Sequence, residues 1–348
     1  MELQRQAIET AAGAGCDQDT PRNHPSPAYA AIDLGTHNCR MLIAKPRGRG
    51  LRVLGSFSRI VRLGEAVACS GKLCEDAMLR TLDALTICAQ KMEAHGVLRS
   101  RSVATAACRL AGNSPKFLER VRAETGLDLE VISAKEEARL TLMGCVPLVS
   151  RRAERALLLD IGGGSTEVAW IETNCQGDVQ IIDMISLDMG VVSLAEEFGD
   201  GHLSDENLQT IVARVEVQLR PFDARNDIMR TIQRGGSQMI GTSGTVTTLG
   251  ALSLGLNRYD RRRVDGLKLS FDHADLIGGR LMRMSKAQRA EHPAIGVERV
   301  GMVGVGCAIM KAICDFWPLG RMTVADRGIR EGALLELMAL DRRAQAAE

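Results

Sequence analysis

One stretch of the chain combines carboxylates, glycines and hydroxyls in a way that suits phosphate and a divalent cation. The apolar run 156–159 ends in Asp160, and after Ile161 the chain continues with Gly162, Gly163, Gly164, Ser165, Thr166 and Glu167. Glycines at a hairpin tip leave backbone N–H groups open to an anion. Mg²⁺ prefers carboxylate oxygens where it bridges to phosphates. The stretch therefore indicates a phosphate and Mg²⁺ site between two strands, with an ordinary glycine-rich turn and solvated acids as the alternative.

A second stretch repeats this design near the start of the chain. Asp33 ends the apolar run 28–32, and Gly35 and Thr36 lie between it and another apolar run. An aspartate at the end of a buried strand is unfavourable unless it has a partner. Two such hairpins in separate halves of the chain predict two lobes that face one polyanion.

A third loop adds a further anion site. The apolar residues 239–240 run into Gly241, Thr242, Ser243 and Gly244, and a helix is expected to follow. The N-terminus of a helix presents free backbone N–H groups and a partial positive charge, so it favours a phosphate.

Composition excludes several classes of protein. The 348 residues carry 44 basic and 43 acidic side chains, and only 3% are aromatic, so neither bulk charge nor stacking platforms indicate a nucleic-acid duplex as partner. The ten cysteines include no C-x-x-C pair, which favours reduced, buried thiols. The chain has no apolar run of membrane-spanning length and no signal-peptide core, so we expect a cytoplasmic protein without a membrane partner.

The order of elements predicts an α/β fold with mostly parallel or mixed sheets, because strands alternate with helices. Residues 1–27 are polar and aperiodic and are expected to form a disordered arm. The charged segment after Pro147 predicts a boundary between a first lobe, 28–150, and a second lobe, 151–348, with the final helix able to pack back on the first lobe.

Several strings along the chain resemble one protein family. IDLGTHNCRMLIA, EVISAKEEARL, LLDIGGGSTEVAWI and VADRGIREGAL occur in the order typical of the exopolyphosphatase / guanosine pentaphosphate phosphohydrolase (Ppx/GppA) family, and the similarity extends over about residues 28–340. The resemblance implies two ribonuclease-H-like lobes around a cleft, the fold shared by actin, sugar kinases and heat-shock chaperone ATPases. It also makes a homodimer an option.

The resemblance assigns roles to several residues. It implies that Glu137 is the general base for an attacking water, and that Asp160 and Glu167 bind Mg²⁺, or Mn²⁺, with Asp33 supporting from the opposite lobe. The phosphate-binding residues would be Asp33, Gly35, Thr36, Arg109, Gly162, Gly163, Gly164, Ser165, Thr166, Gly241, Thr242, Ser243, Gly244 and Arg262. The alternatives are helix-surface ion pairs for Glu137, an exposed surface position for Arg109, and a solvated basic face around Arg262.

The chain departs from the family pattern in three places. His37-Asn38 stands where Asn-Ser is common, Ala106 where Asn is common, and Ala134 where glycine is usual. The first two could weaken or retune phosphate contacts, whereas the third would need only a backbone accommodation.

The expected function is release of terminal orthophosphate from inorganic polyphosphate, from the 5′-triphosphate of guanosine pentaphosphate, or from both. One alternative is a non-catalytic sensor that binds guanosine tetra- or pentaphosphate in the same cleft. It is motivated by His37, by Ala106 and by the absence, within these 348 residues, of the helical domains that end the family's longer members. The other alternative is an ATP-using kinase or ATPase of the same superfold.

Overall fold

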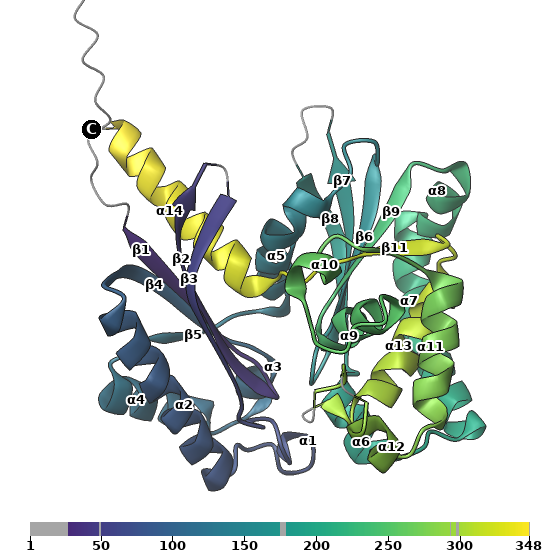
Figure 1. Ribbon diagram of the computed structural model, residues 1–348, viewed down its shortest axis with the longest axis horizontal. Helices are drawn as coiled ribbons and strands as arrows, with labels where there is room; N and C mark the ends of the chain where they lie inside the picture. Colours follow the sequence, from purple (N-terminus) through teal and green to yellow (C-terminus); the bar gives the residue numbers. More distant parts are fainter. Residues whose placement is uncertain (1–26, 49, 175–178, 293, 297–298, 348) are drawn as a thin grey trace, which may run out of the picture.

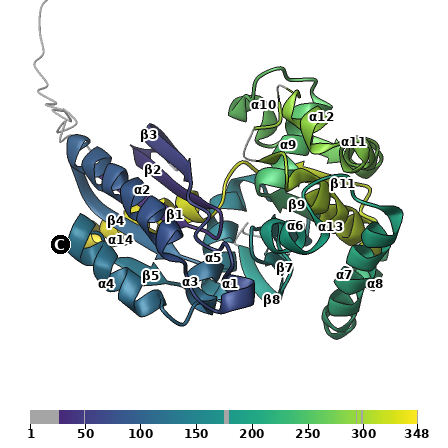
Figure 2. The same cartoon turned by 90° about the horizontal axis from the view of Figure 1, so that it is seen from below.

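The structure is a computed structural model that describes residues 27–347 except 49, 175–178, 293 and 297–298. The arm expected at 1–27 therefore lies outside the described residues, apart from residue 27. The described chain forms two lobes, each built on one sheet, which Figure 2 shows side by side. No helix among the described residues is long and apolar enough to cross a membrane.

The first lobe contains a five-stranded sheet in the order β3-β2-β1-β4-β5. Its strands are β1 (Ala28–Leu34), β2 (Asn38–Arg47), β3 (Gly50–Ile60), β4 (Val97–Ala104) and β5 (Leu129–Val131). The first three strands are antiparallel neighbours, and β4 and β5 continue the sheet parallel to β1. This arrangement is the ribonuclease-H-like one, and the predicted first hairpin is confirmed as β1–β2.

The second lobe repeats the arrangement in the order β10-β11-β9-β6-β7-β8. Its strands are β6 (Arg155–Ile161), β7 (Thr166–Thr173), β8 (Val179–Leu187), β9 (Ser237–Thr242), β10 (Lys268–Ser270) and β11 (Arg321–Val324). Strands β6, β7 and β8 are antiparallel neighbours, β9 and β11 extend the sheet parallel to β6, and β10 adds an antiparallel edge. The glycine-rich hairpin is confirmed as β6–β7, and so is the fold class, because two lobes with the same strand arrangement enclose a cleft.

Fourteen α-helices and one 3₁₀ helix are found in the described residues. They are α1 (Val67–Ser70), α2 (Glu75–Ala94), α3 (Ala106–Leu110), α4 (Ser114–Thr125), α5 (Ala134–Cys145), η1 (Val146–Leu148), α6 (Val191–Phe198), α7 (Asp205–Asn226), α8 (Ile228–Arg234), α9 (Gly244–Ser253), α10 (Arg261–Val264), α11 (Phe271–Arg283), α12 (Lys286–Ala290), α13 (Val303–Phe316) and α14 (Ile329–Ala347).

Alternation along each central strand supplies two apolar faces, because successive strand residues point to opposite sides of a sheet. On β6, Leu157 and Leu159 belong to a core shared with α7 and α13, whereas Leu158 belongs to a core on the other face shared with α5. On β1, Ile32 faces the core under α2 and α4, while Ala31 packs under α14. Each sheet is therefore covered on both faces.

Two helices link the lobes. The first, α5, belongs to the 28–150 range yet packs on the second sheet, whereas α14 comes last in the chain and lies along the first sheet (Figure 1). The helices cross where a Cβ on Gly332 would lie only 1.9 Å from the backbone oxygen of Leu140. Since the crossing leaves no room for a side chain there, glycine is required. The site residues on α5 and at the start of α14 are thus fixed relative to both sheets.

A buried arginine joins three segments of the second lobe. The Arg289 side chain is fully buried, and its guanidinium donates to the carbonyls of Leu281 at 2.9 Å, Asp200 at 3.1 Å, Val300 at 3.0 Å and Gly201 at 2.6 Å. These contacts connect the end of α11 to the turn before α7 and to the segment that enters α13.

Replacing Arg289 with Met is expected to lower the free energy of unfolding by about 3 kcal/mol or more, because each buried carbonyl left without a donor costs about 1–3 kcal/mol. Urea unfolding followed by far-UV circular dichroism measures the loss. Arg283→Met is the matched control, since Arg283 is exposed on α11. A loss no larger than that of the control would contradict the structural role of Arg289.

Candidate functional site

A cavity of about 330 Å³ lies between the lobes. Both hairpin tips, the first turn of α5 and the loop before α9 contribute to its lining. The predicted site residues that line it are Asp33, Gly35, Thr36, Glu137, Asp160, Gly162, Gly163, Gly164, Ser165, Thr242, Ser243 and Gly244. The two aspartate hairpins therefore open into one shared cavity.

The two hairpin tips touch each other across the cleft. A Cβ on Gly164 would lie 2.9 Å from Oγ1 of Thr36, and a Cβ on Gly163 would lie 3.2 Å from Cβ of the same threonine. Behind the tip, a Cβ on Gly190 would lie 2.3 Å from the backbone oxygen of Gly163. Glycine is needed here because the backbone segments approach closely. The absence of side chains also leaves the N–H groups of the tip accessible to a ligand.

The two aspartates are partly buried acids, and the charge of Asp33 acts on Asp160. Burial raises the pKa of Asp160 to about 7, and the negative charges of Glu167 and Asp33 contribute to the rise. Burial likewise raises the pKa of Asp33, against the lowering effect of Arg40 and Arg330. Because carboxylates in a desolvated cavity repel one another, the site favours a cation between them.

Glu137 occupies the first turn of α5, just after the cap at Ser133, whose hydroxyl accepts from the backbone N–H of Glu136 at 3.2 Å. Its side chain is buried, and Nη1 of Arg109 donates to its Oε2 at 2.7 Å. Burial raises the pKa of Glu137 to about 8, the charge of Glu167 adds to the rise, and Arg109 opposes it. A carboxyl group with a pKa near neutrality can accept a proton from water at working pH.

Glu167 lies behind the glycine tip, outside the cavity lining. Its Oε1 accepts from the hydroxyls of Ser165 at 2.6 Å and Ser186 at 3.0 Å. Burial raises the pKa of Glu167, while these two hydroxyls lower it. In the β6–β7 register Glu167 is the direct cross-strand partner of Asp160. The pair brings two acids to one end of the hairpin, as the spacing of the motif predicts.

Four further predicted site residues also lie outside the lining. Arg109 supports Glu137 from behind, and Thr166 donates through Oγ1 to the carbonyl of Met189 at 2.7 Å, which stabilises the hairpin. Gly241 is buried within β9. The Arg262 side chain on α10 is 92% exposed. Arg262 therefore lies on a solvated basic face, the alternative considered for it above, and not in the cavity.

The third loop holds an unusual residue. Ser243, the N-cap of α9, has a φ of 99°, a conformation that side chains other than glycine rarely adopt. Its buried hydroxyl has no hydrogen-bond partner among the described residues. A strained backbone and an unpaired donor at a helix N-terminus that lines the cavity suit an anion.

Four arginines in the lining, Arg40, Arg299, Arg327 and Arg330, were not anticipated from the sequence. Burial lowers the pKa of Arg40, and the positive charge of Arg330 lowers it further. Arg299 donates to Oγ1 of Thr248 at 2.9 Å. Of these four arginines, only Arg40 could have been predicted from the sequence, because the expected β1–β2 hairpin places it directly opposite Asp33. Together with the carboxylates, these arginines give the cavity groups for both a polyanion and its counter-cation.

The donor set bears on how a metal could bind. Among the described residues, no group of three or more His, Cys, Asp or Glu side chains is arranged to hold a metal ion by itself. Mg²⁺ characteristically keeps several waters and binds through one or two carboxylates plus substrate phosphates. The acid pair Asp160 and Glu167 at one hairpin end and the single acid Asp33 at the other fit that mode of binding, and they do not fit a closed protein cage.

The first two departures from the family pattern fall inside the cavity. His37, Asn38 and Ala106 all line it. Ala106 lies close to the glycine tip, since a Cβ on Gly164 would lie 3.5 Å from its Cβ. These substitutions therefore change the surface that a substrate would contact.

Comparison with known proteins gives consistent results. The sequence model of the Ppx/GppA phosphatase family matches residues 42–341. A guanosine-5′-triphosphate,3′-diphosphate pyrophosphatase of Photobacterium profundum is 29% identical over 319 residues, which are 91% of this chain and 61% of that relative. The chain thus spans less than two thirds of the relative's length.

Solved structures extend the similarity to the fold. An Aquifex aeolicus member of the Ppx/GppA protein family has 26% identity and a TM-score of 0.74, over 91% of this chain and 99% of its own. An exopolyphosphatase from Cytophaga hutchinsonii ATCC 33406 has a TM-score of 0.80 at 23% identity, over 90% of this chain and 98% of its own. The second comparison is a likeness of fold alone.

Proposed function

Because this chain belongs to the Ppx/GppA phosphatase family, we propose that it hydrolyses the terminal phosphoryl group of a phosphate chain. The substrate would be inorganic polyphosphate, the 5′-triphosphate of guanosine pentaphosphate, or both. The observation that carries the proposal is the shared cavity, in which Asp33, Asp160 and Glu137 meet three glycine- or hydroxyl-rich loops.

Catalysis of this reaction depends on positioning of the reacting groups more than on covalent chemistry by the protein. In-line attack by water on a terminal phosphoryl group requires a base beside the water and donors on the phosphate oxygens. Glu137 would accept the proton of the water, and Arg109 would orient its carboxylate through the 2.7 Å hydrogen bond. Backbone N–H groups of the two hairpin tips and of the loop before α9 would bind the phosphate oxygens.

A divalent cation completes the site. Asp160 and Glu167, with Asp33 in support from the other lobe, would hold Mg²⁺ or Mn²⁺ through its water shell, and the bound ion would neutralise charge on the phosphate oxygens. The support for this assignment is the cluster of acids whose pKa values burial raises, together with the repulsion that Glu167 and Asp33 exert on Asp160.

Phosphate release tests the function directly. With Mg²⁺ present, the purified chain is expected to release orthophosphate from long polyphosphate or from guanosine pentaphosphate in a colorimetric assay. Comparison of the initial rates on the two substrates identifies the preferred one. No release from either would overturn the proposal.

A second candidate is a sensor that binds guanosine tetra- or pentaphosphate without turnover. The observation that favours it is that His37 and Ala106, both departures from the family pattern, line the cavity. Tight binding of guanosine pentaphosphate by calorimetry, with no phosphate released over hours, would support the sensor.

The pH dependence of turnover tests the base. Since burial raises the pKa of Glu137 to about 8, kcat/KM is expected to rise with pH as the carboxyl ionises and to level off above that value. Arg109→Gln removes a hydrogen bond and a positive charge that lower this pKa. In this variant the rise of kcat/KM with pH should therefore move to higher pH by about one unit or more. Rates on polyphosphate at fixed free Mg²⁺ provide the profile.

The control for this profile is Arg122→Gln, on the exposed face of α4. Its pH profile should coincide with that of the wild type. An unshifted limb in Arg109→Gln would show that a different group sets the pH dependence.

A further inference from the structure

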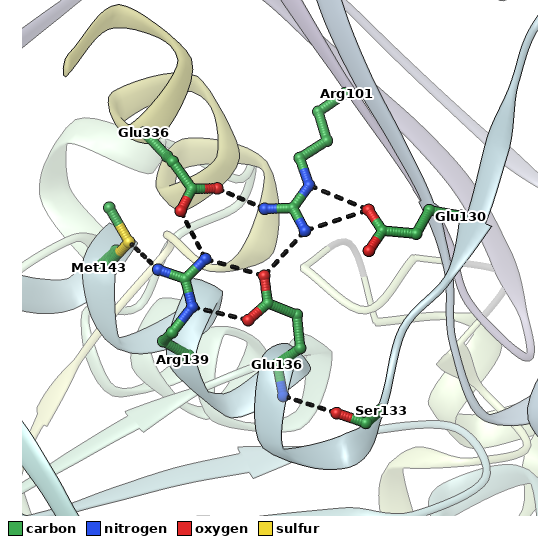
Figure 3. Close-up of polar contacts among 7 residues, drawn as sticks. All are labelled: Arg101, Glu130, Ser133, Glu136, Arg139, Met143 and Glu336. Atoms are coloured by element: carbon green, nitrogen blue, oxygen red, sulfur yellow. Dashed lines mark hydrogen bonds and ion pairs between the residues drawn. The ribbon is translucent and has the colours of Figure 1, made fainter. Parts of the chain in front are cut away.

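Four charged side chains from three elements close a ring beside the candidate site (Figure 3). Arg101 of β4 donates to Glu136 of α5 at 2.8 Å, and Arg139 of α5 donates to the same carboxylate at 2.6 Å. Both arginines also pair with Glu336 of α14, Arg139 at 2.6 Å. Glu130 of β5 adds an outer partner for Arg101 at 3.1 Å. Opposite charges therefore alternate around a closed circuit.

The ring is more shielded than an ordinary surface ion pair. The side chains of Arg101, Glu136 and Glu336 are 18%, 25% and 23% exposed, and only that of Arg139, the fourth member, is more open at 40%. The pKa of Glu136 is lowered, chiefly because Arg139 donates hydrogen bonds to it. An isolated exposed pair contributes little to stability, whereas a connected network fixes the geometry of the segments that carry it.

The ring meets the candidate base through neighbouring residues. Consecutive residues of an α-helix point about 100° apart, so Glu136 enters the ring while Glu137 enters the cavity. The partners of both glutamates come from one continuous segment: Arg101 lies in β4, and Arg109 lies in α3 just after it. Two arginines of one segment thus bind the two adjacent carboxylates in the first turn of α5.

We propose that Arg101 is a positioning residue, and that the ring sets the orientation of the first turn of α5 and so directs the Glu137 carboxylate into the cavity. This inference rests on the proposed phosphohydrolase function. The ring joins the first sheet, through β4, to α14 on that sheet and to α5 on the second sheet, so the base is placed relative to both lobes. A displacement of about 1 Å in a reacting group can lower a rate about a hundredfold.

The test separates positioning from simple stabilisation. Arg101→Gln is expected to lower kcat about tenfold or more while KM stays within about twofold, because water activation suffers and phosphate binding does not. Arg101→Lys, which keeps the charge but has no planar fork, should recover part of the lost kcat. Glu336→Gln should lower kcat as well, and the double variant should lose less than the product of the two single losses, since both changes open the same ring.

The control is Arg120→Gln. Arg120 also bridges two glutamates, Glu75 and Glu124, but it does so on α4 and α2. This variant should keep the wild-type kcat. Thermal unfolding of each variant confirms that rates are compared between folded proteins.

Hydrogen–deuterium exchange supplies a readout that does not depend on turnover. Peptides that cover residues 133–139 should exchange faster in Arg101→Gln than in wild type, and the same peptides in Arg120→Gln should not. Unchanged kcat with unchanged exchange would overturn the positioning role. If wild type hydrolyses neither substrate, the proposed function fails and exchange alone decides: faster exchange in Arg101→Gln supports the ring's control of α5, and equal exchange overturns it.

Discussion

Replacing Glu137 with Gln is expected to lower kcat for phosphate release by about a thousandfold, because a positioned general base contributes about 10²–10⁴-fold to such a step. Glutamine has the size of glutamate, so the cavity keeps its shape, but its amide accepts no proton from water at neutral pH. Binding of substrate should change little, since the proposed phosphate contacts come from the hairpin tips and the loop before α9. Orthophosphate release with saturating Mg²⁺ measures the rate, and calorimetry with guanosine tetraphosphate measures binding.

Glu119→Gln is the matched control, because Glu119 is exposed on α4. It should keep the wild-type rate. A Glu137→Gln variant that retains about a third of wild-type turnover, far above the loss expected for a missing base, would remove Glu137 from that role.

Replacing Asp160 with Asn is expected to stabilise the protein while impairing turnover. Burial raises the pKa of Asp160 from 3.8 to about 7 in the folded state, so between these values the folded protein retains a proton that the unfolded chain releases. Stability contributed by this group is thus complete at low pH and falls as pH rises through about 7. Above that pH the Asn variant should gain about 2 kcal/mol or more, since each pKa unit corresponds to about 1.4 kcal/mol.

Urea unfolding without added Mg²⁺ at about pH 4 and about pH 8 measures this gain, which should be present at the higher pH and nearly absent at the lower one. Asp128→Asn, at an exposed position before β5, should show no such pH-dependent difference. If Asp160→Asn is no more stable than wild type at the higher pH, then ionised Asp160 does not destabilise the metal-free folded protein, and this account of the site is contradicted.

The two hairpins could be predicted because their signals are local. Apolar alternation, glycine tips and terminal acids lie close to one another in sequence, and the predicted β1–β2 and β6–β7 pairs are those observed. The register of each hairpin also determines which side chains are cross-strand partners. Asp33 lies opposite Arg40, and Asp160 lies opposite Glu167.

The remaining features depend on contacts between distant parts of the chain. Arg101 and Glu336 are 235 residues apart in sequence, and no local pattern indicates that β4 and α14 lie together. The same holds for α5, which packs on the second sheet and crosses α14 at Gly332, far away in the sequence. Arg262 likewise has the same sequence neighbours whether its side chain lines a cavity or faces solvent, and here the side chain faces solvent.

Hydrolysis in ¹⁸O-labelled water tests the central claim most directly. If water activated by Glu137 attacks the terminal phosphorus of polyphosphate, mass spectrometry should find one ¹⁸O in each released orthophosphate and none in the shortened chain. Label in the shortened chain would place the attack on the neighbouring phosphorus, and unlabelled phosphate or transfer to another acceptor would exclude direct hydrolysis. Either of these results would contradict the account.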